Sequence, residues 1–285
     1  MHYDTAVALI TNVDADHLDH YGSEDAFERE FARFAEGASE FVVISSDDPG
    51  AKRVTRLIQN KKVITFGLDK HASLRLFDVD ASGAEVTFAV EYQGQVLRGE
   101  LLVPGEHNAI NATGALAVLV GLGFDAHDAL HAICSFKGTE RRFQLHGERR
   151  GVRVYDDFAH HPTEVAAALK AARAVVGSGR LVTVFQPHLY SRTRLMHAAF
   201  ADALAASDKV VVLDIYAARE DPEPGVTGVM VADSFADQSQ VHYVPTWDDA
   251  PAVAAGLAEA GDFIITMGCG DVYRMVPQLL EALEK

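Results

Sequence analysis

The chain has 285 residues, 48% of them hydrophobic, so it is long enough for two domains with sizeable cores. Its 41 acidic residues outnumber its 25 lysines and arginines, which gives a net charge of −16. This excess of acid argues against a nucleic-acid-binding surface, which needs clustered positive charge. An anionic substrate would therefore need a local basic pocket.

Cysteine use and hydropathy indicate where the protein works. Cys134 and Cys269 are the two cysteines and form no CxxC pair, which predicts a reducing compartment and two buried thiols, although a disulfide between them stays possible. No apolar run approaches the roughly 20 residues that span a bilayer. The N-terminus lacks the basic region and cleavage site of a signal peptide. We therefore expect a cytoplasmic protein with no membrane partner.

The first part of the chain alternates short apolar runs with helical patterns, as α/β folds do. Buried strands are expected at residues 6–11, 41–45 and 61–67. Residues 23–36 place three phenylalanines on one face of a helix that Ser23 is expected to cap. Residues 74–103 differ, because their pattern is typical of antiparallel strands with a hairpin turn at Gln93-Gly94.

Two helices are expected next, at 104–123 and at 125–136, the second capped by Asp125. The polar, glycine-bearing stretch after them predicts a domain boundary, so we expect domains at 1–146 and 147–285.

Beyond this boundary, strands and helices alternate regularly, which predicts a doubly wound parallel sheet. Ligands of such sheets bind beyond the carboxyl ends of the strands. Four polar motifs lie at such ends: DDFAHH (156–161), QPHLYSR (186–192), DIYAARE (214–220) and GCGDVY (268–273).

The motif TNVDADHLDHY (11–21) follows the first expected strand. Its acids and imidazoles are Asp14, Asp16, His17, Asp19 and His20. Oxygen and imidazole ligands at a strand end suit a divalent cation. A loop of helix-capping acids with one core histidine is the alternative, and the spacing leaves both open.

The motif PGEHNAIN (104–111) starts a helix. His107 and Asn108 lie four and three residues before Asn111, so the three side chains share a face. A helix start offers free N–H groups, and asparagine amides pair with donors and acceptors alike, as a purine edge requires. The alternative is that Asn108 caps the helix.

Two arginine-containing motifs suit an anion. Arg141 and Arg142 are adjacent in GTERRF, and arginine suits two-pronged contact with phosphate or carboxylate. Surface ion pairing is the alternative. His188, Arg192 and Arg194 follow a strand in the same way. GCGDVY resembles a phosphate loop only weakly, and a tight turn is the simpler interpretation.

Taken together, these motifs resemble the Mur ligases, ATP-dependent amide-bond-forming enzymes of peptidoglycan synthesis. The matching stretches, in the family's order, are TNVDADHLDHY, PGEHNAINATGA, FKGTERRF, DDFAHHPTEV, FQPHLYSRTR, DIYAARE and GCGDVY. The DDFAHHPTE stretch is distinctive of the branch that adds L-alanine to UDP-N-acetylmuramate through an acyl phosphate. The resemblance implies a partial central ATP-binding α/β domain followed by a C-terminal Rossmann-like domain.

The resemblance also implies roles for single residues, with ATP and Mg²⁺ as cofactors. His17 matches a histidine that helps to hold magnesium. The residues matching the nucleotide site are His107, Asn108, Asn111, Arg142 and Asp157. Those matching the site of the amino acid and substrate carboxylate are His160, His188 and Arg192. The residues implied in catalysis are His17, Arg142, Asp157 and His160. Leu189 and Phe158 replace an arginine and a tyrosine of some relatives, so the amino-acid pocket is expected to differ.

The family's N-terminal uridine-nucleotide domain, its GTxGK-type phosphate loop and its metal-binding glutamate have no match in this sequence. We therefore expect a truncated ligase that is inactive alone, with an exposed sheet edge that a second copy of the chain can cover. Two alternatives are a muropeptide-recycling ligase, which joins a tripeptide to the same sugar nucleotide, and a non-catalytic nucleotide-binding module.

Overall fold

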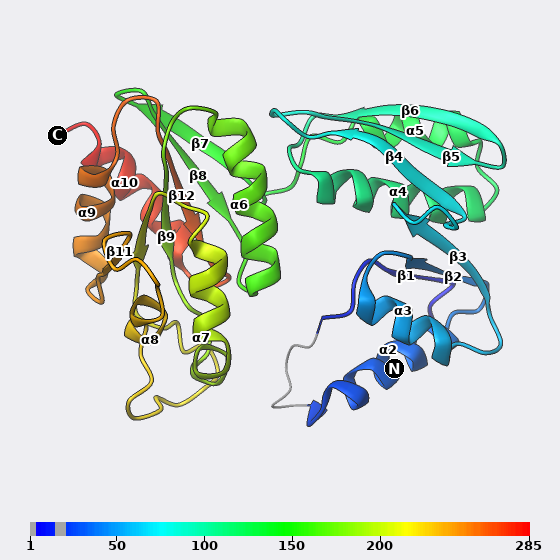
Figure 1. Cartoon of the computed structure of the whole chain (residues 1–285), viewed down its shortest axis with the longest axis horizontal. Coiled ribbons are helices and arrows are strands. Elements are labelled where there is room, and N and C mark those ends of the chain that lie inside the picture. The colour runs from blue at the N-terminus through cyan, green and yellow to red at the C-terminus, as the bar shows by residue number, and fades with distance from the viewer. Residues whose placement is uncertain (1–3, 15–20) are drawn as a thin grey trace. The chain divides into compact units, whose positions relative to one another are not determined.

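The computed structural model describes residues 4–14 and 21–285, which form two compact units, Met1–Lys137 and Gly138–Lys285 (Figure 1). Each unit contains a six-stranded sheet flanked by helices. The units divide earlier in the chain than the boundary at 146/147 expected from the sequence. The reason is strand β7 (Gln144–Arg149), which the sequence did not predict and which pairs with the second sheet.

The first sheet has its six strands in chain order. They are β1 (Val7–Ile10), β2 (Phe41–Ser45), β3 (Lys62–Gly67), β4 (Leu74–Asp80), β5 (Val86–Tyr92) and β6 (Gln95–Leu101). Strands β1 to β4 run parallel, and β4, β5 and β6 run antiparallel. The predicted hairpin is confirmed, because Gln93 and Gly94 have φ of 50° and 77° between β5 and β6.

Helices cover both faces of the first sheet. They are α2 (Glu24–Glu36), α3 (Pro49–Leu57), α4 (Glu106–Gly121) and α5 (Ala126–Cys134). Alternate residues of β2 enter the two cores: Val42 packs with α2 and α3, whereas Val43 packs with α4 and α5. The predicted caps are confirmed, since Ser23 accepts a hydrogen bond from the Ala26 N–H and Asp125 accepts one from His127.

The second sheet has the order β11-β10-β9-β12-β8-β7. Its strands after β7 are β8 (Val152–Asp157), β9 (Leu181–Phe185), β10 (Lys209–Val212), β11 (Val241–Tyr243) and β12 (Phe263–Met267). All pairs are parallel except β7 with β8, which confirms the predicted doubly wound sheet. The carboxyl ends of the neighbouring strands β8, β12 and β9 therefore lie side by side at the same end of the sheet.

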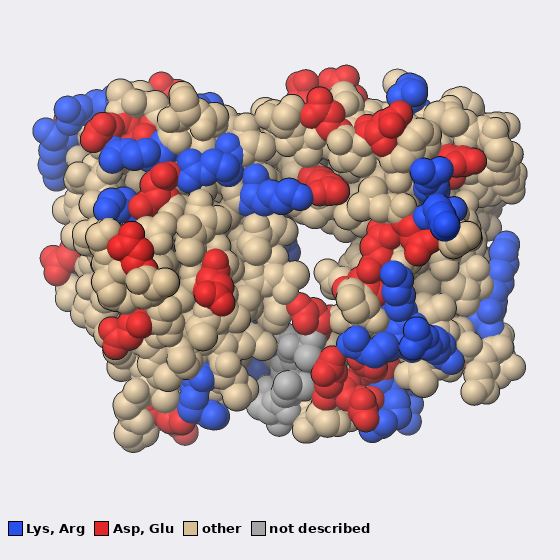
Figure 2. Space-filling view, in the orientation of Figure 1, with Lys and Arg blue, Asp and Glu red and all other residues tan. Residues whose placement is uncertain are grey.

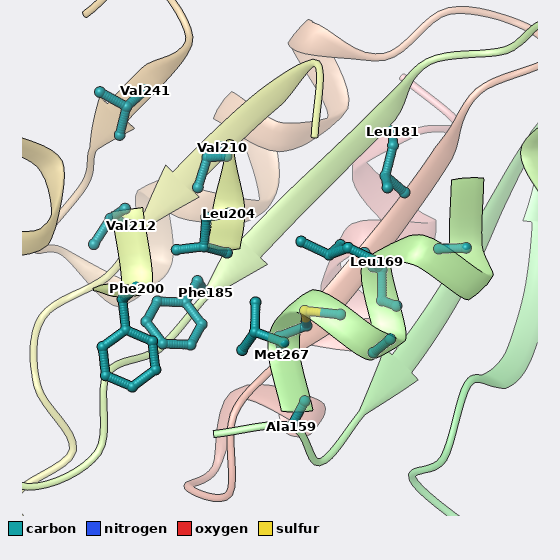
Figure 3. Packing of buried hydrophobic residues seen from close by; sticks show 14 of the residues in the cluster. Ala159, Leu169, Leu181, Phe185, Phe200, Leu204, Val210, Val212, Val241 and Met267 are labelled. Carbon is teal, nitrogen blue, oxygen red and sulfur yellow. The ribbon is translucent and has the colours of Figure 1, made fainter. Parts of the chain in front are cut away.

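Helices lie on both faces of this sheet (Figure 1). They are α6 (Pro162–Val176), α7 (Tyr190–Leu204), α8 (Val229–Asp233), α9 (Ala250–Leu257) and α10 (Val276–Ala282). Figure 3 shows the core under α6 and α7, where the rings of Phe185 and Phe200 lie 5.0 Å apart near Met267. Because Phe185 ends β9 and Met267 ends β12, this core fixes the backbone at the edge that carries the polar motifs.

No helix in the described part of the chain is long and apolar enough to cross a membrane. Both cysteines are free thiols, and each is half-buried rather than buried as expected. On the faces drawn in Figure 2, basic and acidic side chains are interspersed in both units.

Candidate active site

In the first unit, the candidate nucleotide-binding residues lie at the start of α4. Gly105, with φ of 98°, is the N-cap, and no side chain caps the helix. Asn108 is therefore not the N-cap; its Nδ2 donates to the Pro104 carbonyl at 2.7 Å. His107 is half-buried. Asn111 is exposed one turn further on, and its amide has no hydrogen-bond partner among the described residues. This helix start therefore offers one exposed amide to a ligand.

The start of the loop after β1 is held by a hydrogen bond at Val13, the residue before Asp14. Asp48 caps α3 by accepting from the Ala51 N–H at 2.7 Å, and it also accepts from the Val13 N–H at 2.9 Å. His17 and the other members of the candidate metal motif, apart from Asp14, lie outside the described residues. Within residues 4–14 and 21–285, no group of three histidine, cysteine or acidic side chains is placed to hold a metal.

In the second unit, Asp156 at the end of β8 is fully buried and bound by the protein itself. Its Oδ2 accepts from the Arg141 Nε at 2.9 Å, and its Oδ1 accepts from the Thr266 hydroxyl at 2.6 Å. Arg141 also donates to the Gly268 carbonyl at 2.6 Å. A buried carboxylate needs such partners, because an unpaired one would lose its hydration without compensation.

Aromatic rings and backbone conformation complete the binding of Arg141. Its guanidinium lies 4.8 Å from the centre of the Phe158 ring and 4.4 Å from that of Tyr273. Its φ of 58° turns the chain sharply, so the neighbouring Arg142 is exposed. Arg142 forms no ion pair with any described residue, and its guanidinium lies 5.6 Å from the Phe158 ring. Arg141 is thus bound by the protein, whereas the adjacent Arg142 is exposed to solvent.

Asp157 fastens the loop that carries Arg142. It is 5% exposed, and its two oxygens accept from the backbone N–H groups of Ala159 and Phe143, both at 2.8 Å. Burial raises the pKa of Asp157, although these hydrogen bonds and the charge of Arg142 oppose the rise. Its carboxylate is therefore largely occupied by the backbone, and it holds Arg142 close to the end of β8.

His160 lies between β8 and α6, within the DDFAHH motif. Its Nδ1 lies 3.0 Å from the Phe158 carbonyl and 3.3 Å from a Glu164 carboxylate oxygen, so this nitrogen carries the proton. The His160 ring meets the rings of Phe158 and His188 edge-on, at 5.3 and 6.2 Å between centroids. The structure thus brings His160 and His188 together.

His188 follows β9 and is held in one protonation state. Arg192 is 4% exposed on α7, and its Nη1 lies 3.3 Å from the His188 Nδ1. A guanidinium has only donors, so Nδ1 accepts and the His188 proton sits on Nε2. Burial, followed by the charge of Arg192, lowers the pKa of His188 to about 4. Near pH 7 the site therefore presents a neutral, half-buried N–H donor.

The backbone between His188 and α7 is strained. Leu189 is 2% exposed and has φ of 70° and ψ of 136°, a conformation that residues with a side chain rarely adopt. Such strain costs about 1–3 kcal/mol and persists only where the surroundings enforce it. Here the Leu189 N–H donates to the Tyr216 carbonyl at 3.0 Å, and the Tyr216 N–H donates to the Pro187 carbonyl at 2.9 Å. These bonds orient His188.

The glycines after β12 allow a close backbone approach. A Cβ on Gly268, whose φ is 145°, would lie 2.8 Å from the Gln186 carbonyl oxygen. A Cβ on Gly270 would lie 2.5 Å from the Gln186 Oε1 and 2.8 Å from the Tyr216 ring. The Gln186 amide binds Val272 and Asp271, which closes the turn. The tight-turn interpretation of GCGDVY is therefore confirmed.

One edge of the second sheet thus gathers groups that suit an anion. Arg142 lies against Phe158, Phe158 contacts His160, and His160 contacts His188. The site includes a cation, a neutral donor and a second imidazole, with the buried charge of Arg192 behind His188. Sequence reasoning missed the part of Arg141. The adjacent acids Asp156 and Asp157 could have indicated this role. If both acids face the protein interior, a buried cation must lie near them.

Two family models match the chain: the Mur ligase middle domain over residues 1–119, and the Mur ligase glutamate ligase domain over residues 141–270. The chain belongs to the Mur ligase family. This confirms the resemblance inferred from the ordered motifs and the α/β class of both units.

Two curated proteins similar to this Mur ligase chain share one name. The UDP-N-acetylmuramate–L-alanine ligase of Clavibacter sepedonicus is 59% identical over 284 residues, which are 99% of this chain and 59% of that protein. The ligase of the same name from Thermobifida fusca is 45% identical, over 97% of this chain and 61% of that protein. The chain therefore spans about three fifths of the length of these relatives.

Solved structures show the same fold. The UDP-N-acetylmuramate–alanine ligase of Thermotoga maritima superposes with a TM-score of 0.78 at 28% identity, covering 98% of this Mur ligase chain and 60% of that one. A murein peptide ligase from Psychrobacter arcticus superposes with a TM-score of 0.72 at 21% identity, covering 100% of this chain and 58% of that one, which shows the fold alone.

Proposed function

We propose that this chain forms the middle and C-terminal part of an ATP-dependent ligase that joins L-alanine to UDP-N-acetylmuramate in peptidoglycan precursor synthesis. The observation that carries the proposal is the 59% identity, over 99% of the chain, to a protein named for that reaction. The geometry of the second unit supports it, because an L-alanine carboxylate needs positively charged or N–H groups in an otherwise acidic protein.

The proposed reaction has two steps. The carboxylate of UDP-N-acetylmuramate attacks the γ-phosphorus of ATP, which releases ADP and leaves an acyl phosphate. The amine of L-alanine then attacks the acyl carbon, expels phosphate and loses a proton, which leaves the amide. Negative charge builds on the phosphoryl oxygens in the first step, so a fixed cation accelerates it.

On the nucleotide side, Asn111 has the exposed amide that an adenine edge requires, with His107 and Asn108 on the same helix start. Arg142 is an exposed cation beside the end of β8, and we assign it to the phosphates. Asp157 fixes the loop that carries Arg142, because it accepts from the Phe143 N–H. Magnesium would neutralise phosphate charge. We assign it to His17, since the described residues provide no group of three metal ligands.

On the amino-acid side, we propose that the His188 Nε2–H donates to the carboxylate of L-alanine. Arg192 fixes the tautomer of His188 and adds a positive charge behind it. His160 contacts the His188 ring and completes the amino-acid site. Because His188 is neutral near pH 7, it binds as a donor and does not trap the amino acid in a strong ion pair.

Partners and location follow from the same proposal. The free thiols fit a reducing compartment, and we place the protein in the cytoplasm, with neither nucleic acid nor membrane as a partner. Strand β1 lies at the edge of the first sheet, where a second copy of the chain could pair. A recycling ligase or a non-catalytic nucleotide-binding module would share the fold, and the identity to L-alanine ligases favours the reaction proposed here.

Phosphate release tests the proposal. We would supply Mg-ATP and UDP-N-acetylmuramate with either L-alanine or the tripeptide, using this chain and a version extended upstream to the length of its relatives. We expect release only from the extended version and only with L-alanine. Release with the tripeptide alone would favour the recycling ligase. Phosphate release by the 285-residue chain would contradict the expected inactivity of this part. No phosphate release by either protein would contradict the ligase proposal.

A further inference from the structure

Glu220, the last residue of DIYAARE, binds the start of helix α7 from a distant part of the chain. Its Oε2 accepts from the Ser191 N–H at 3.0 Å, and its Oε1 accepts from the Ser191 hydroxyl. The Tyr190 N–H is a further donor to this carboxylate. Leu189, the N-cap of α7, has a side chain that cannot accept these bonds. Glu220 therefore acts as a helix cap, although it lies 29 residues after Ser191 in the chain.

These bonds extend the connection between two loops. The Leu189 and Tyr216 N–H groups already join residues 187–189 to Tyr216, and the His188 ring stacks on the Tyr216 ring at 5.8 Å between centroids. Glu220 adds the last contact of this connection, on the far side of the strained Leu189. A strained residue relaxes unless contacts on both sides hold it. Loss of Glu220 would therefore free the chain segment that carries His188.

We propose that Glu220 is a positioning residue, whose carboxylate holds the start of α7 against residues 214–220 and thereby keeps the His188 ring between Arg192 and Tyr216. The proposal rests on the proposed function only in treating His188 as the group that meets the amino-acid carboxylate. The placement of the ring is a property of the chain itself and can be measured without substrate.

The pKa of His188 distinguishes a positioning role of Glu220 from a direct effect of its charge. The charged groups facing His188 are Arg192 on α7, His160 before α6, and Arg219 and Glu220 on the facing loop. The first three lower the pKa of His188, and Glu220 raises it. Removing the Glu220 charge alone would thus lower the pKa further. Releasing the ring from burial and from Arg192 would instead raise it toward the ordinary value of about 6.5.

The test is an NMR pH titration of the histidines in the 285-residue chain, with the His188 signal assigned from its loss in His188→Gln. We expect Glu220→Ala to raise the pKa of His188 by at least about one unit. An unchanged or lowered pKa would overturn the proposal. Glu223→Ala is the matched control, because Glu223 lies on the same loop and pairs with the exposed Arg194. This control is expected to leave the pKa unchanged, and an equal rise there would also overturn the proposal.

A second variant covers the case in which Glu220→Ala does not fold. Ser191→Ala removes one donor to Glu220 and leaves the carboxylate in place. We expect a smaller rise in the pKa of His188, and no rise would overturn the proposal. Phosphate release by the extended protein is independent of this result. Activity with L-alanine but no pKa shift would remove only the positioning role, whereas a pKa shift without activity would remove only the proposed function.

Discussion

The candidate residues of the two units differ in how the protein holds them. At the strand ends of the second unit, the buried polar groups bind one another, as Asp156 does with Arg141 and Thr266. At the start of α4 in the first unit, Asn108 makes one local hydrogen bond and Asn111 faces solvent. The second unit is therefore preorganised before any ligand arrives, which lowers the cost of reorganisation during reaction.

The same division recurs between neighbouring residues of each motif. Arg141 is bound by the protein while Arg142 is exposed, and Arg192 is buried while His188 is half-buried. In the first unit, Asn108 is the bound member and Asn111 is the exposed one. The comparison teaches that a motif combines a residue that fixes the backbone with a residue that can meet a ligand. Substitutions of the two kinds should therefore separate stability from binding.

The largest expected effect comes from breaking the buried pair of the second unit. Asp156→Ala leaves the Arg141 guanidinium without its carboxylate, and we expect a loss of about 3–5 kcal/mol in the free energy of unfolding. Urea unfolding measures it. Glu30→Ala is the control, since its pair with Arg33 is exposed and should contribute less than about 1 kcal/mol. Equal losses from the two variants would contradict the assignment of Asp156.

A second test concerns the strain at Leu189. Leu189→Ala removes a buried side chain and should cost about 2–5 kcal/mol. Leu189→Gly removes one more carbon atom but tolerates the positive φ, so we expect it to be more stable than the alanine variant by about 1 kcal/mol. Chemical unfolding of both variants checks the order. A glycine variant less stable than the alanine variant would show that Leu189 is not strained.

The pH dependence of stability should report His188. Its pKa is lowered to about 4 in the fold, from an ordinary value of about 6.5, so the unfolded chain takes up the proton first as the pH falls. The contribution of neutral His188 is thus complete above pH 6.5 or so and is lost as the pH falls through about 4. Between pH 7 and 4, the wild type should lose more unfolding free energy than His188→Gln does. Parallel pH profiles would contradict this.

The smallest expected effects separate the two asparagines of α4. Asn108→Ala should cost about 1 kcal/mol of unfolding free energy, because it removes the hydrogen bond to Pro104. Asn111→Ala should change stability by less than about 0.5 kcal/mol and weaken nucleotide binding, measured with a fluorescent ATP analogue. The reverse pattern would reverse the roles given to the two residues.

Much of the fold could be predicted from the sequence because local signals and the global arrangement agree. Apolar runs gave the parallel strands, and Ser23 and Asp125 gave two helix starts that the structure confirms. Strand β7 was missed because its exposed, charged side chains lack the buried pattern of the other strands. The three-residue strand β11 is too short to produce a periodic signal.

Less of the candidate site could be predicted, because its geometry depends on contacts between distant residues. The sequence RR does not show which of the two arginines the protein itself binds. This depends on the positive φ of Arg141 and on its partner Asp156. The part of Glu220 depends on Ser191, 29 residues earlier. Periodicity and capping rules describe contacts within a few residues, so they carry no information on such pairs.

The most direct test of the account is the Michaelis constant for L-alanine in the upstream-extended protein, measured by phosphate release for the wild type and for His188→Ala. The account predicts that the variant loses a hydrogen bond to a carboxylate, worth about 1.5–3 kcal/mol, so that this constant rises about tenfold or more. The constant for ATP should stay within about twofold. A constant for L-alanine that stays unchanged, or a rise for ATP instead, would contradict the claim that the strand ends of the second unit bind the amino acid.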